Sequence, residues 1–452
     1  FTGGVDSAAD MGAYRMALAV GVAAGLIQFL SGTLRMGILA ELFPTAAVHG
    51  MLAAIGIIII AKQLPIALGV SAHGEPLELL LHIPDHLKNM NPEIALIGLI
   101  SLIILFSIPL IKNKYIQKIP GPMLVVLIAI PLGIYFNLST EHTYSFDHQT
   151  YEINKTYLLD VPSNLLAVIT FPDFTALKNP IAWKWVIMFV LIGSVESLLS
   201  AKAIDLMDPW KRKSNMNKDL MAIGVGNTLS ALIGGLPMIS EIVRSRANID
   251  NGAKTRFSNM FHGIFLLLFV ASLPGLLHQI PLAALGAMLV YTGCRLASPK
   301  EFAHIYRIGS EQLVVFVVTL MAVLATDLLI GVAVGIALEA IIHLIHGAPF
   351  RSLFISNIDV AENKNETLIK LNHSAVFSNW LALRKHLETR GLNINKNVTI
   401  DFSEVKLVDH TVMSKLNELQ LEFSSINRVL TLTGLDSHKP FSSHKLAARK
   451  RA

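Results

Sequence analysis

The sequence predicts an all-α polytopic membrane protein with a small α/β domain at its C-terminal end. Of its 452 residues, 53% are hydrophobic and only 15% are charged, whereas a soluble domain carries roughly 25% charged residues. Apolar runs long enough to cross a bilayer, about 20 residues, recur as far as residue 346. Beyond the Gly-Ala-Pro sequence at 347–349, polar and apolar residues alternate as in soluble domains. We therefore expect a transmembrane domain at 1–346, an α/β domain at 350–436 and a basic polar tail at 437–452.

The charge and cysteine content exclude several classes of protein. The net charge of +5 would suit a nucleic-acid partner, but the Lys and Arg residues lie in short clusters between apolar runs, as in the cytoplasmic loops of membrane proteins. We therefore expect a lipid bilayer as partner and no nucleic acid. The single cysteine, Cys294, excludes a disulfide framework, a cysteine-based zinc site and an iron–sulfur cluster.

Ten apolar runs are expected to cross the bilayer because each is long and poor in charge. In chain order these runs are 12–31, 45–64, 92–111, 120–138, 183–203, 219–236, 258–277, 281–297, 311–326 and 328–346. The segment 238–250 lies between two of them but is too short and too charged to cross alone. Together with the helix interruption before it, this segment is expected to complete one crossing of the bilayer.

The distribution of basic residues predicts the orientation of the chain. Three loops are basic and should face the cytoplasm. They hold Lys112, Lys114 and Lys118; Lys211, Arg212, Lys213 and Lys218; and Arg295, Lys300 and Arg307. The long segment 139–180 has only two lysines and should face outward. This orientation predicts a multi-pass protein of the inner cell membrane with its α/β domain in the cytoplasm.

An internal repeat is visible in two short stretches. Residues 43–52 read FPTAAVHGML and residues 280–289 read IPLAALGAML, so that Pro, Ala, Ala, Met and Leu coincide at an offset of 237 residues. The predicted topology runs the two copies in opposite directions, which is the inverted repeat of many secondary transporters. Because the partner of the span at 183–203 would lie before residue 1, we expect the chain to lack about three N-terminal transmembrane segments.

The span at 183–203 carries an acidic residue, Glu196. A carboxylate at that depth is costly and usually functional. Gly193 and Ser200 lie three residues before and four after it, so the three share one helix face. A carboxylate and a hydroxyl on one face favour coordination of a cation or transfer of a proton, whereas an interhelical hydrogen bond is the structural alternative.

The stretch GGLPMISEIVRSR at 234–246 is the most informative in the chain. Gly-Gly-Leu-Pro ends a helix, and a short helix can restart at Ser240, which is a candidate N-cap. A helix that begins inside the membrane offers free backbone N–H groups and a partial positive charge to an anion. Arg244 adds a full positive charge, whereas Glu241 repels an anion unless it is neutralised. A re-entrant loop with paired charges is the alternative.

The C-terminal region predicts a β-α-β-α-β domain. Strands are expected at 366–372, 397–402 and 427–433, and helices at 377–389 and 409–424. Asp409 is a candidate cap for the second helix. Thr411 is expected to be exposed beside it, as an ordinary residue of the first helical turn or, alternatively, as a phosphorylated regulatory site together with Asp409. The region has no glycine-rich nucleotide loop and no catalytic triad spacing, so no enzymatic activity and no cofactor are expected. His343 and His346 lack a third ligand, so no metal is expected either.

Most of the chain resembles the SulP, or solute carrier family 26, anion transporters. The matching stretches are IPGPM at 119–123, VESLLSAKAID at 195–205, the segment 217–256 and the Pro-Ala-Ala spans, while 350–436 resembles the C-terminal STAS domain of that family, with its signature turn at 397–412. The resemblance implies a fold of seven plus seven inverted-repeat segments with a core and a gate domain. It also implies a homodimer and a cytoplasmic partner for the STAS domain.

The resemblance assigns roles to individual residues. Ser240, Glu241 and Ile242 match the start of the tenth-segment half-helix that binds the anion, and Arg244 matches the arginine of the family. Glu196 and Ser200 match the acid and hydroxyl that bind the coupling cation in sodium-dependent bicarbonate members. Ile242 replaces a hydroxyl of those members, which favours proton coupling. Thr411 lies where related anti-sigma-factor antagonists carry a phosphorylated serine, but Val412 replaces the glycine that follows.

The function expected from these observations is secondary active transport of a small inorganic anion, sulfate or bicarbonate, coupled to H⁺ or Na⁺. Two alternatives stay open, an uncoupled anion channel and a non-transporting membrane anchor for STAS-domain signalling. A nucleobase transporter shares the fold class, but the STAS-like domain and the arginine in the predicted pocket argue against it.

Overall fold

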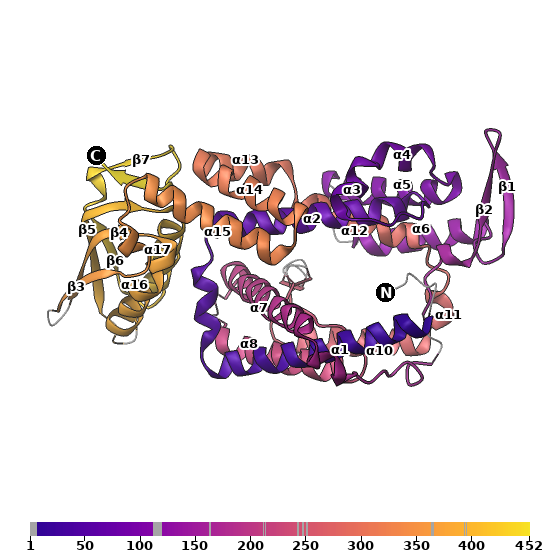
Figure 1. Ribbon diagram of the computed structural model, residues 1–452, viewed down its shortest axis with the longest axis horizontal. Coiled ribbons are helices and arrows are strands. Elements are labelled where there is room, and N and C mark those ends of the chain that lie inside the picture. The colour runs from indigo at the N-terminus through magenta and orange to yellow at the C-terminus, as the bar shows by residue number, and fades with distance from the viewer. Residues whose placement is uncertain are drawn as a thin grey trace. The chain divides into compact units, whose positions relative to one another are not determined.

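The computed structural model describes residues 7–111, 120–161, 164–210, 212, 214–241, 244–245, 248–249, 252–362, 366–392, 394 and 396–452. The chain divides into two compact units. The first unit consists of Phe1–Met51, Pro172–Ile242 and Pro299–Ala452, and the second consists of Leu52–Phe171 and Val243–Ser298. Figure 1 shows the helices of both units and the sheet formed by the last hundred or so residues.

Each of the ten predicted spans overlaps a helix. The first unit contains α1 (Ser7–Thr33), η1 (Met36–Leu42), α7 (Pro180–Met207), α8 (Met216–Leu232), α13 (Pro299–Ile308), α14 (Ser310–Ala325) and α15 (Leu328–Ile345). The second contains α3 (Pro76–Leu81), α4 (Ile83–Lys88), α5 (Pro92–Ser107), α6 (Gly121–Tyr135), α10 (Phe257–Ser272), α11 (Pro274–Leu277) and α12 (Leu282–Leu296), and α2 (Thr45–Ala67) starts in the first unit and ends in the second. Among the described residues, five helices are both long and apolar enough to span a bilayer.

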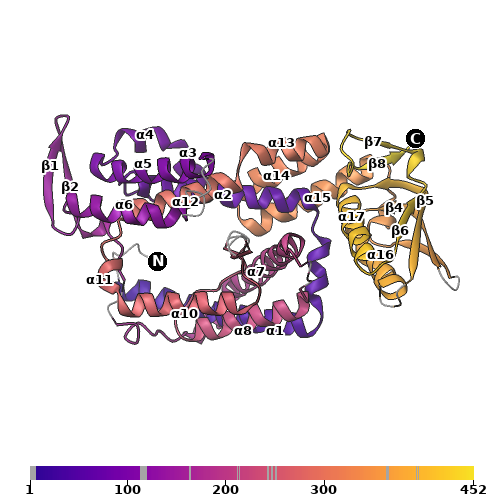
Figure 2. The ribbon, with the colours of Figure 1, turned by 180° about the vertical axis from the view of Figure 1, so that it is seen from behind.

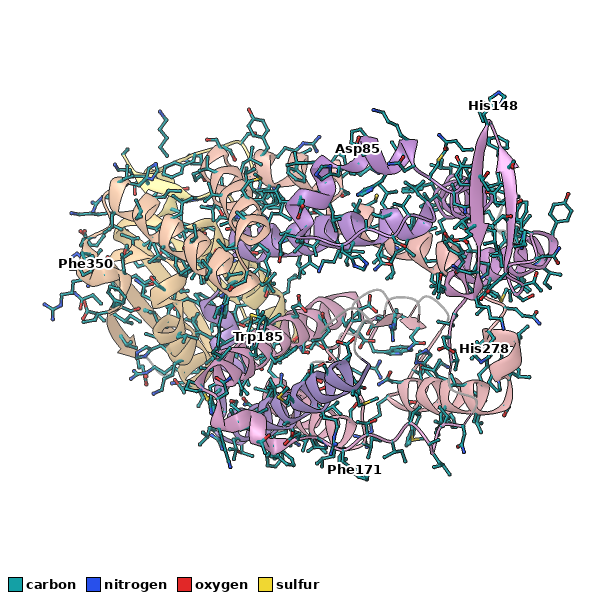
Figure 3. The ribbon with its side chains drawn as sticks, turned by 45° about the vertical axis from the view of Figure 1, so that its right-hand side comes forward. Asp85, His148, Phe171, Trp185, His278 and Phe350 are labelled. Atoms are coloured by element: carbon teal, nitrogen blue, oxygen red, sulfur yellow. The ribbon has the colours of Figure 1, made fainter. Side chains whose placement is uncertain are left out.

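Several of these helices start at an asparagine or aspartate cap. The Asn91 side chain accepts a hydrogen bond from the Ile94 N–H at the start of α5, and the Asn179 side chain does the same for Ile181 at the start of α7. In both helices the next residue is proline, which needs no N–H partner at that position. Figure 3 labels Trp185 near the beginning of α7.

Helices α1 and α8 lie side by side in the first unit (Figures 1 and 2). A Cβ atom at Gly224 would lie 2.4 Å from the Phe29 backbone nitrogen and 2.7 Å from the Gly25 carbonyl oxygen. Only glycine permits backbones to approach so closely. Within the Gly-Val-Gly sequence at 224–226, Gly224 is therefore the glycine that permits α8 to pack closely against α1.

The two copies of the sequence repeat begin helices in the same way. Helix α2 starts directly after Pro44 and α12 directly after Pro281. Within the second unit, a Cβ atom at Gly56 would lie 2.7 Å from the Gly293 carbonyl oxygen, and one at Gly293 would lie 2.5 Å from the Gly56 carbonyl oxygen. These glycines are 237 residues apart, the offset of the repeat. Equivalent positions of two related elements touch each other when they meet at a two-fold axis.

A β-hairpin in the second unit was not predicted. Strand β1 (His142–Phe146) pairs antiparallel with β2 (Gln149–Ile153). The two residues of the turn, Asp147 and His148, have positive φ angles of 45° and 62°, as in the turns that suit the twist of a hairpin. His148 marks the tip of this hairpin in Figure 3. The turn lacks the glycine by which such hairpins are usually recognised in a sequence.

The C-terminal domain is a mixed sheet with helices. Its strands are β3 (Asn357–Glu362), β4 (Glu366–Ala375), β5 (Asn397–Val408), β6 (Leu430–Thr433), β7 (His438–Pro440) and β8 (Arg449–Arg451), and its α-helices are α16 (Trp380–Leu387) and α17 (His410–Ser425). The parallel order β4-β5-β6 confirms the predicted β-α-β-α-β core. Trp380, Ile400, Phe402 and Phe423 are fully buried in it.

Two parts of this domain correct the sequence interpretation. Strand β3, which pairs antiparallel with β4, was not predicted. The region 437–452, interpreted as a basic polar tail, contributes β7 and β8 to the sheet. Strand β5 is long enough to pair with β6 at residues 398–401 and with β8 at 407–408. The buried pair Ala447 and Ala448 is too short to be recognised as an apolar pattern.

Candidate functional site

The predicted interruption of the helix after α8 is present in the first unit. Helix α8 ends at Leu232, and Gly234 has a φ of 106°, which lies in the region that favours glycine. The Gly235 N–H donates to the Ser230 carbonyl oxygen at 2.7 Å, so the turn is closed by the backbone. Residues 235–241 are not helical.

The restart of the helix differs from the prediction. Ser240 is a candidate N-cap, and an N-cap residue has non-helical backbone. Glu241, which would then be the first helical residue, is also non-helical, and helical backbone is next described at Arg244. Ile242, predicted to line the anion site, lies outside the described residues. Arg244 is exposed and falls in the second segment of the second unit, residues 243–298. The interrupted segment is defined here as residues 234–241.

Two side chains hold the interrupted segment through its backbone. The Met238 N–H donates to Asn227 Oδ1 at 2.8 Å, and the Ser240 N–H donates to Ser197 Oγ at 3.1 Å. Asn227 comes from α8 and Ser197 from α7. Because backbone N–H groups away from water need an acceptor, these two side chains stabilise the extended conformation against a continuous helix.

A buried glutamine on α1 connects α7 and α8, the two helices whose side chains hold the interrupted segment. The Asn227 Nδ2 group donates to Gln28 Oε1 at 2.9 Å, and Gln28 Nε2 donates to Ser194 Oγ on α7 at 3.4 Å. Gln28 and Asn227 are each 2% exposed. The Tyr14 hydroxyl, also on α1, donates to the Gly234 carbonyl oxygen at the start of the interrupted segment. The polar network thus ties α1, α7 and α8 to the break.

The predicted coupling residues lie beside this network. Glu196 is partly buried and directly precedes Ser197, and Ser200 is 8% exposed. Gly193, on the same helix face, lies against the network, because a Cβ atom there would be 3.0 Å from Gln28 Nε2 and 3.7 Å from Ile239 Cγ2. The fold therefore brings Gly193 to the interrupted segment. Glu196 is the neighbour in sequence of Ser197, whose side chain holds that segment.

Sequence reasoning missed Gln28, Asn227 and Ser197. The available signal was their polarity within apolar helices, which is the same signal that identified Glu196. Amides and hydroxyls give a weaker signal than carboxylates because they are less costly in a membrane. Their partners are distant in sequence, so the network was visible only in the fold.

The two STAS-region residues are placed differently from the prediction. Asp409 caps α17, as predicted, because its Oδ1 accepts from the Val412 N–H at 2.6 Å. Thr411 was predicted to be exposed, but this prediction is wrong, because the residue is 0% exposed. Its Oγ1 accepts from the Thr45 N–H at 3.2 Å and lies 3.0 Å from Thr45 Oγ1. The signature turn therefore packs against the start of α2.

A buried carboxylate at the end of η1 reinforces this packing. Glu41 is 2% exposed. Its Oε2 accepts from Trp380 Nε1 at 3.1 Å and lies 3.4 Å from Lys415 Nζ, and its Oε1 lies 2.5 Å from Arg384 Nη1. Burial lowers the pKa of Lys415 to about 7 and raises the pKa of Asp409 to about 7, because both groups are removed from water.

Comparisons with known proteins identify the family. The profile of the Sulfate permease family matches residues 4–319. This match covers more than half of the chain, so the chain belongs to the Sulfate permease family. The membership confirms the resemblance on which the site residues were assigned.

Two relatives illustrate the similarity. The protein named "Putative sulfate transporter YvdB" of Bacillus subtilis (strain 168) is 25% identical over 95% of this chain and 79% of its own length. The bicarbonate transporter BicA of Synechocystis sp. (strain PCC 6803) is 24% identical over 79% of this chain and 60% of its own length. The chain spans little more than half of two mycobacterial relatives, 56% of each.

Solved structures show the same fold. The overall structure of SLC26A9 aligns with 96% of this chain and 72% of its own at a TM-score of 0.63 and 16% identity. The transmembrane domain of the cyanobacterial bicarbonate transporter BicA aligns with 72% of this chain and 77% of its own at a TM-score of 0.57 and 22% identity. At these identities the likeness concerns the fold alone.

Proposed function

We propose that this protein transports a small inorganic anion, sulfate or bicarbonate, across the inner cell membrane by secondary active transport coupled to H⁺ or Na⁺. The observation that carries the proposal is the interrupted segment, which Asn227 and Ser197 hold open within a bundle of apolar helices. The names of the relatives, sulfate and bicarbonate transporters, support the class of substrate.

The proposed anion site comprises Ser240, Glu241, Ile242 and Arg244. An anion would bind backbone N–H groups where the helix resumes after the interrupted segment, with Arg244 supplying a full positive charge. The Ser240 N–H already donates to Ser197, so it positions the segment and the N–H groups that follow would contact the substrate. Glu241 would have to be neutralised, by a proton or a cation, for an anion to bind beside it.

The proposed coupling site comprises Glu196 and Ser200 on α7. Glu196 directly precedes Ser197 in the chain, so occupation of the coupling site acts on the helix that clamps the interrupted segment. A proton or cation bound to Glu196 would remove a negative charge near the anion. This provides a direct electrostatic reason for the two ions to move together.

Transport would proceed by movement of a core domain against a gate domain. We assign α1, α7 and α8 to the core because the polar network ties them together, and α5, α6 and α12 of the second unit to the gate. The reciprocal approach of Gly56 and Gly293 supports an inverted repeat, within the seven-plus-seven scheme of the resemblance. The C-terminal domain would act as a cytoplasmic STAS domain in a homodimer.

The proposal is tested by uptake into proteoliposomes. Purified protein is reconstituted, and accumulation of radiolabelled sulfate and bicarbonate is measured under an imposed H⁺ or Na⁺ gradient. The Glu196→Gln variant should accumulate at least about fivefold less anion under the gradient, the lower end of typical coupling free energies. Anion exchange without a gradient should persist. Asp160→Asn, at a fully exposed aspartate, is the matched control.

Other outcomes would identify the alternatives. Gradient-driven accumulation by Glu196→Gln equal to that of the wild type would remove the coupling role. Conductance without stoichiometric cation movement would indicate an uncoupled channel. Absence of any anion flux would favour a membrane anchor for STAS signalling.

A further inference from the structure

Three buried side chains of metal-ligand type meet where the last membrane helix contacts the C-terminal domain. Glu339 and His343 lie one turn apart on α15, and Asp409 begins α17. His343 Nε2 lies 3.8 Å from Glu339 Oε1 and 3.6 Å from Asp409 Oδ2. The exposed fractions of the three residues are 0%, 4% and 1%. We call these three residues the interdomain triad.

The polar atoms of the interdomain triad are incompletely satisfied. Glu339 Oε2 and His343 Nδ1 are buried and have no hydrogen-bond partner among the residues that the structure describes. The same is true of Oε1 of Gln312, a 2% exposed residue of α14 whose Nε2 reaches Glu339 Oε1 at 3.5 Å. Buried carboxylates without compensating charge are costly, so such a site favours protonation or a bound cation.

The arrangement of donors fits a metal ion better than a set of isolated hydrogen bonds. Tetrahedral Zn²⁺ sites have ligand bonds of about 2.0–2.1 Å, which separate the ligand atoms by about 3.3 Å. The two separations from His343 Nε2, 3.6 and 3.8 Å, exceed this value by a few tenths of an ångström, and one ligand atom of each residue lies within 4.8 Å of the other two. One imidazole with two carboxylates suits Zn²⁺ and similar transition metals, whereas Ca²⁺ takes six to eight oxygen ligands.

The position of Asp409 is fixed from outside the triad. Its Oδ1 accepts from the Val412 N–H at 2.6 Å, and its Oδ2 accepts from the Phe377 N–H at 2.5 Å. Hydrogen bonds of this kind orient the carboxylates of metal sites. The same Oδ2 atom lies 3.6 Å from His343 Nε2.

We propose that Glu339, His343 and Asp409 form a binding site for one divalent transition-metal ion that joins the last membrane helix to the C-terminal domain. The three side chains supply three ligands, and the side-chain oxygen Gln312 Oε1 or a water molecule completes the coordination. Because two ligands come from α15 and one from α17, the ion strengthens the contact between these elements.

Metal binding is tested directly on the full chain. The protein is purified in detergent with a histidine-free tag, stripped with a chelator and titrated with Co²⁺ alone and then with Zn²⁺. We expect one Co²⁺ per chain with the visible absorption of a nitrogen–oxygen site of low coordination number, and displacement of Co²⁺ by Zn²⁺. Elemental analysis after dialysis should give one zinc per chain. Absence of stoichiometric binding to the wild-type chain would overturn the proposal without reference to any variant.

Variants assign the metal to the triad. His343→Gln and Glu339→Gln should each weaken Zn²⁺ binding by at least about 100-fold, more than the loss of an outer-shell partner. His49→Gln is the matched control, because His49 Nδ1 lies 2.6 Å from Glu301 Oε1 in a partly exposed two-residue pair. Cys294→Ala tests the only thiol. Both controls should bind as the wild type does, and equal binding by the triad variants would refute the assignment.

Discussion

Ser197 and Ser200 show how neighbouring hydroxyls on one helix can have different tasks. Both are buried on α7, at 0% and 8% exposure. Ser197 accepts the hydrogen bond from the Ser240 N–H, whereas Ser200 is the hydroxyl of the proposed coupling site. The sequence pointed to Ser200 because it lies four residues after Glu196. The clamping role of Ser197 depends on a partner 43 residues away.

Substitution of the two serines should separate these roles. Ser197→Ala leaves the Ser240 N–H without its acceptor, which should lower the free energy of unfolding by about 1–3 kcal/mol. Ser200→Ala should destabilise the protein less than Ser197→Ala, because it leaves the Ser240 N–H paired with Ser197, and it should reduce gradient-driven accumulation. Unfolding is measured in the same detergent for both variants, with uptake measured in liposomes. Equal stability of Ser197→Ala and wild type would show that the clamp does not stabilise the interrupted segment.

Thr411 is the residue whose interpretation the structure changes most. A motif comparison presents it as an exposed modification site, but here its hydroxyl is fully buried against Thr45. A kinase could reach it only after the signature turn separates from α2. The pattern of residues around a turn predicts a helix cap, as at Asp409, but it carries no information about which surface covers that turn.

At the scale of elements, glycines determine how closely the membrane helices approach. The contacts at Gly25 and Gly224 and at Gly56 and Gly293 bring backbone against backbone. Such contacts allow dispersion and weak C–H···O interactions to stabilise helix pairs where lipid removes the hydrophobic driving force. The apolar pattern predicted the helices themselves, but not which of their faces meet.

Enlarging the glycine of a repeat helix should disrupt the second unit. A Cβ atom at Gly293 would lie 2.5 Å from the Gly56 carbonyl oxygen, so Gly293→Leu forces α2 and α12 apart and should destabilise the protein by at least about 1–3 kcal/mol. Thermal unfolding in detergent measures the effect. Gly263→Leu on α10, where a Cβ atom would have no atom of the described residues within 4 Å, is the control. Similar unfolding temperatures for the two variants would contradict the close contact.

At the scale of the whole molecule, the C-terminal domain is joined to membrane elements by buried polar contacts. Glu41 accepts from Trp380, and Thr45 pairs with Thr411. Ser442 also donates to the Ile308 carbonyl oxygen at the end of α13. These contacts bury charge and hydrogen-bonding groups that are costly to leave unpaired, so the domain is expected to stay docked against these elements.

Cysteine cross-linking should detect this docking. In a Cys294→Ala background, Thr45→Cys combined with Thr411→Cys places two thiols where hydroxyl oxygens lie 3.0 Å apart. Mild oxidation should link them in most molecules, and reductant should reverse the shift seen on a denaturing gel. Thr45→Cys with Ser425→Cys is the control, because Ser425 lies at the far end of α17, about 20 Å along the helix axis. Equal cross-linking of both pairs, or of neither, would contradict the docking contact.

The sequence by itself determined the membrane class, the helices, the helix interruption at 234–237 and the order of the C-terminal β-α-β-α-β core. These features follow from local properties, namely hydrophobic runs, helix breakers and alternation. It also singled out Glu196, because a carboxylate in an apolar run is conspicuous.

Only the tertiary structure decided which residues meet. Gln28, Asn227 and Ser197 gather around the interrupted segment from three helices, Thr411 is covered by the start of α2, and Asp409 joins Glu339 and His343. The physical reason is that buried polar groups are satisfied by partners from anywhere in the chain. Such pairing leaves no periodic trace in the sequence, whereas burial of apolar surface does.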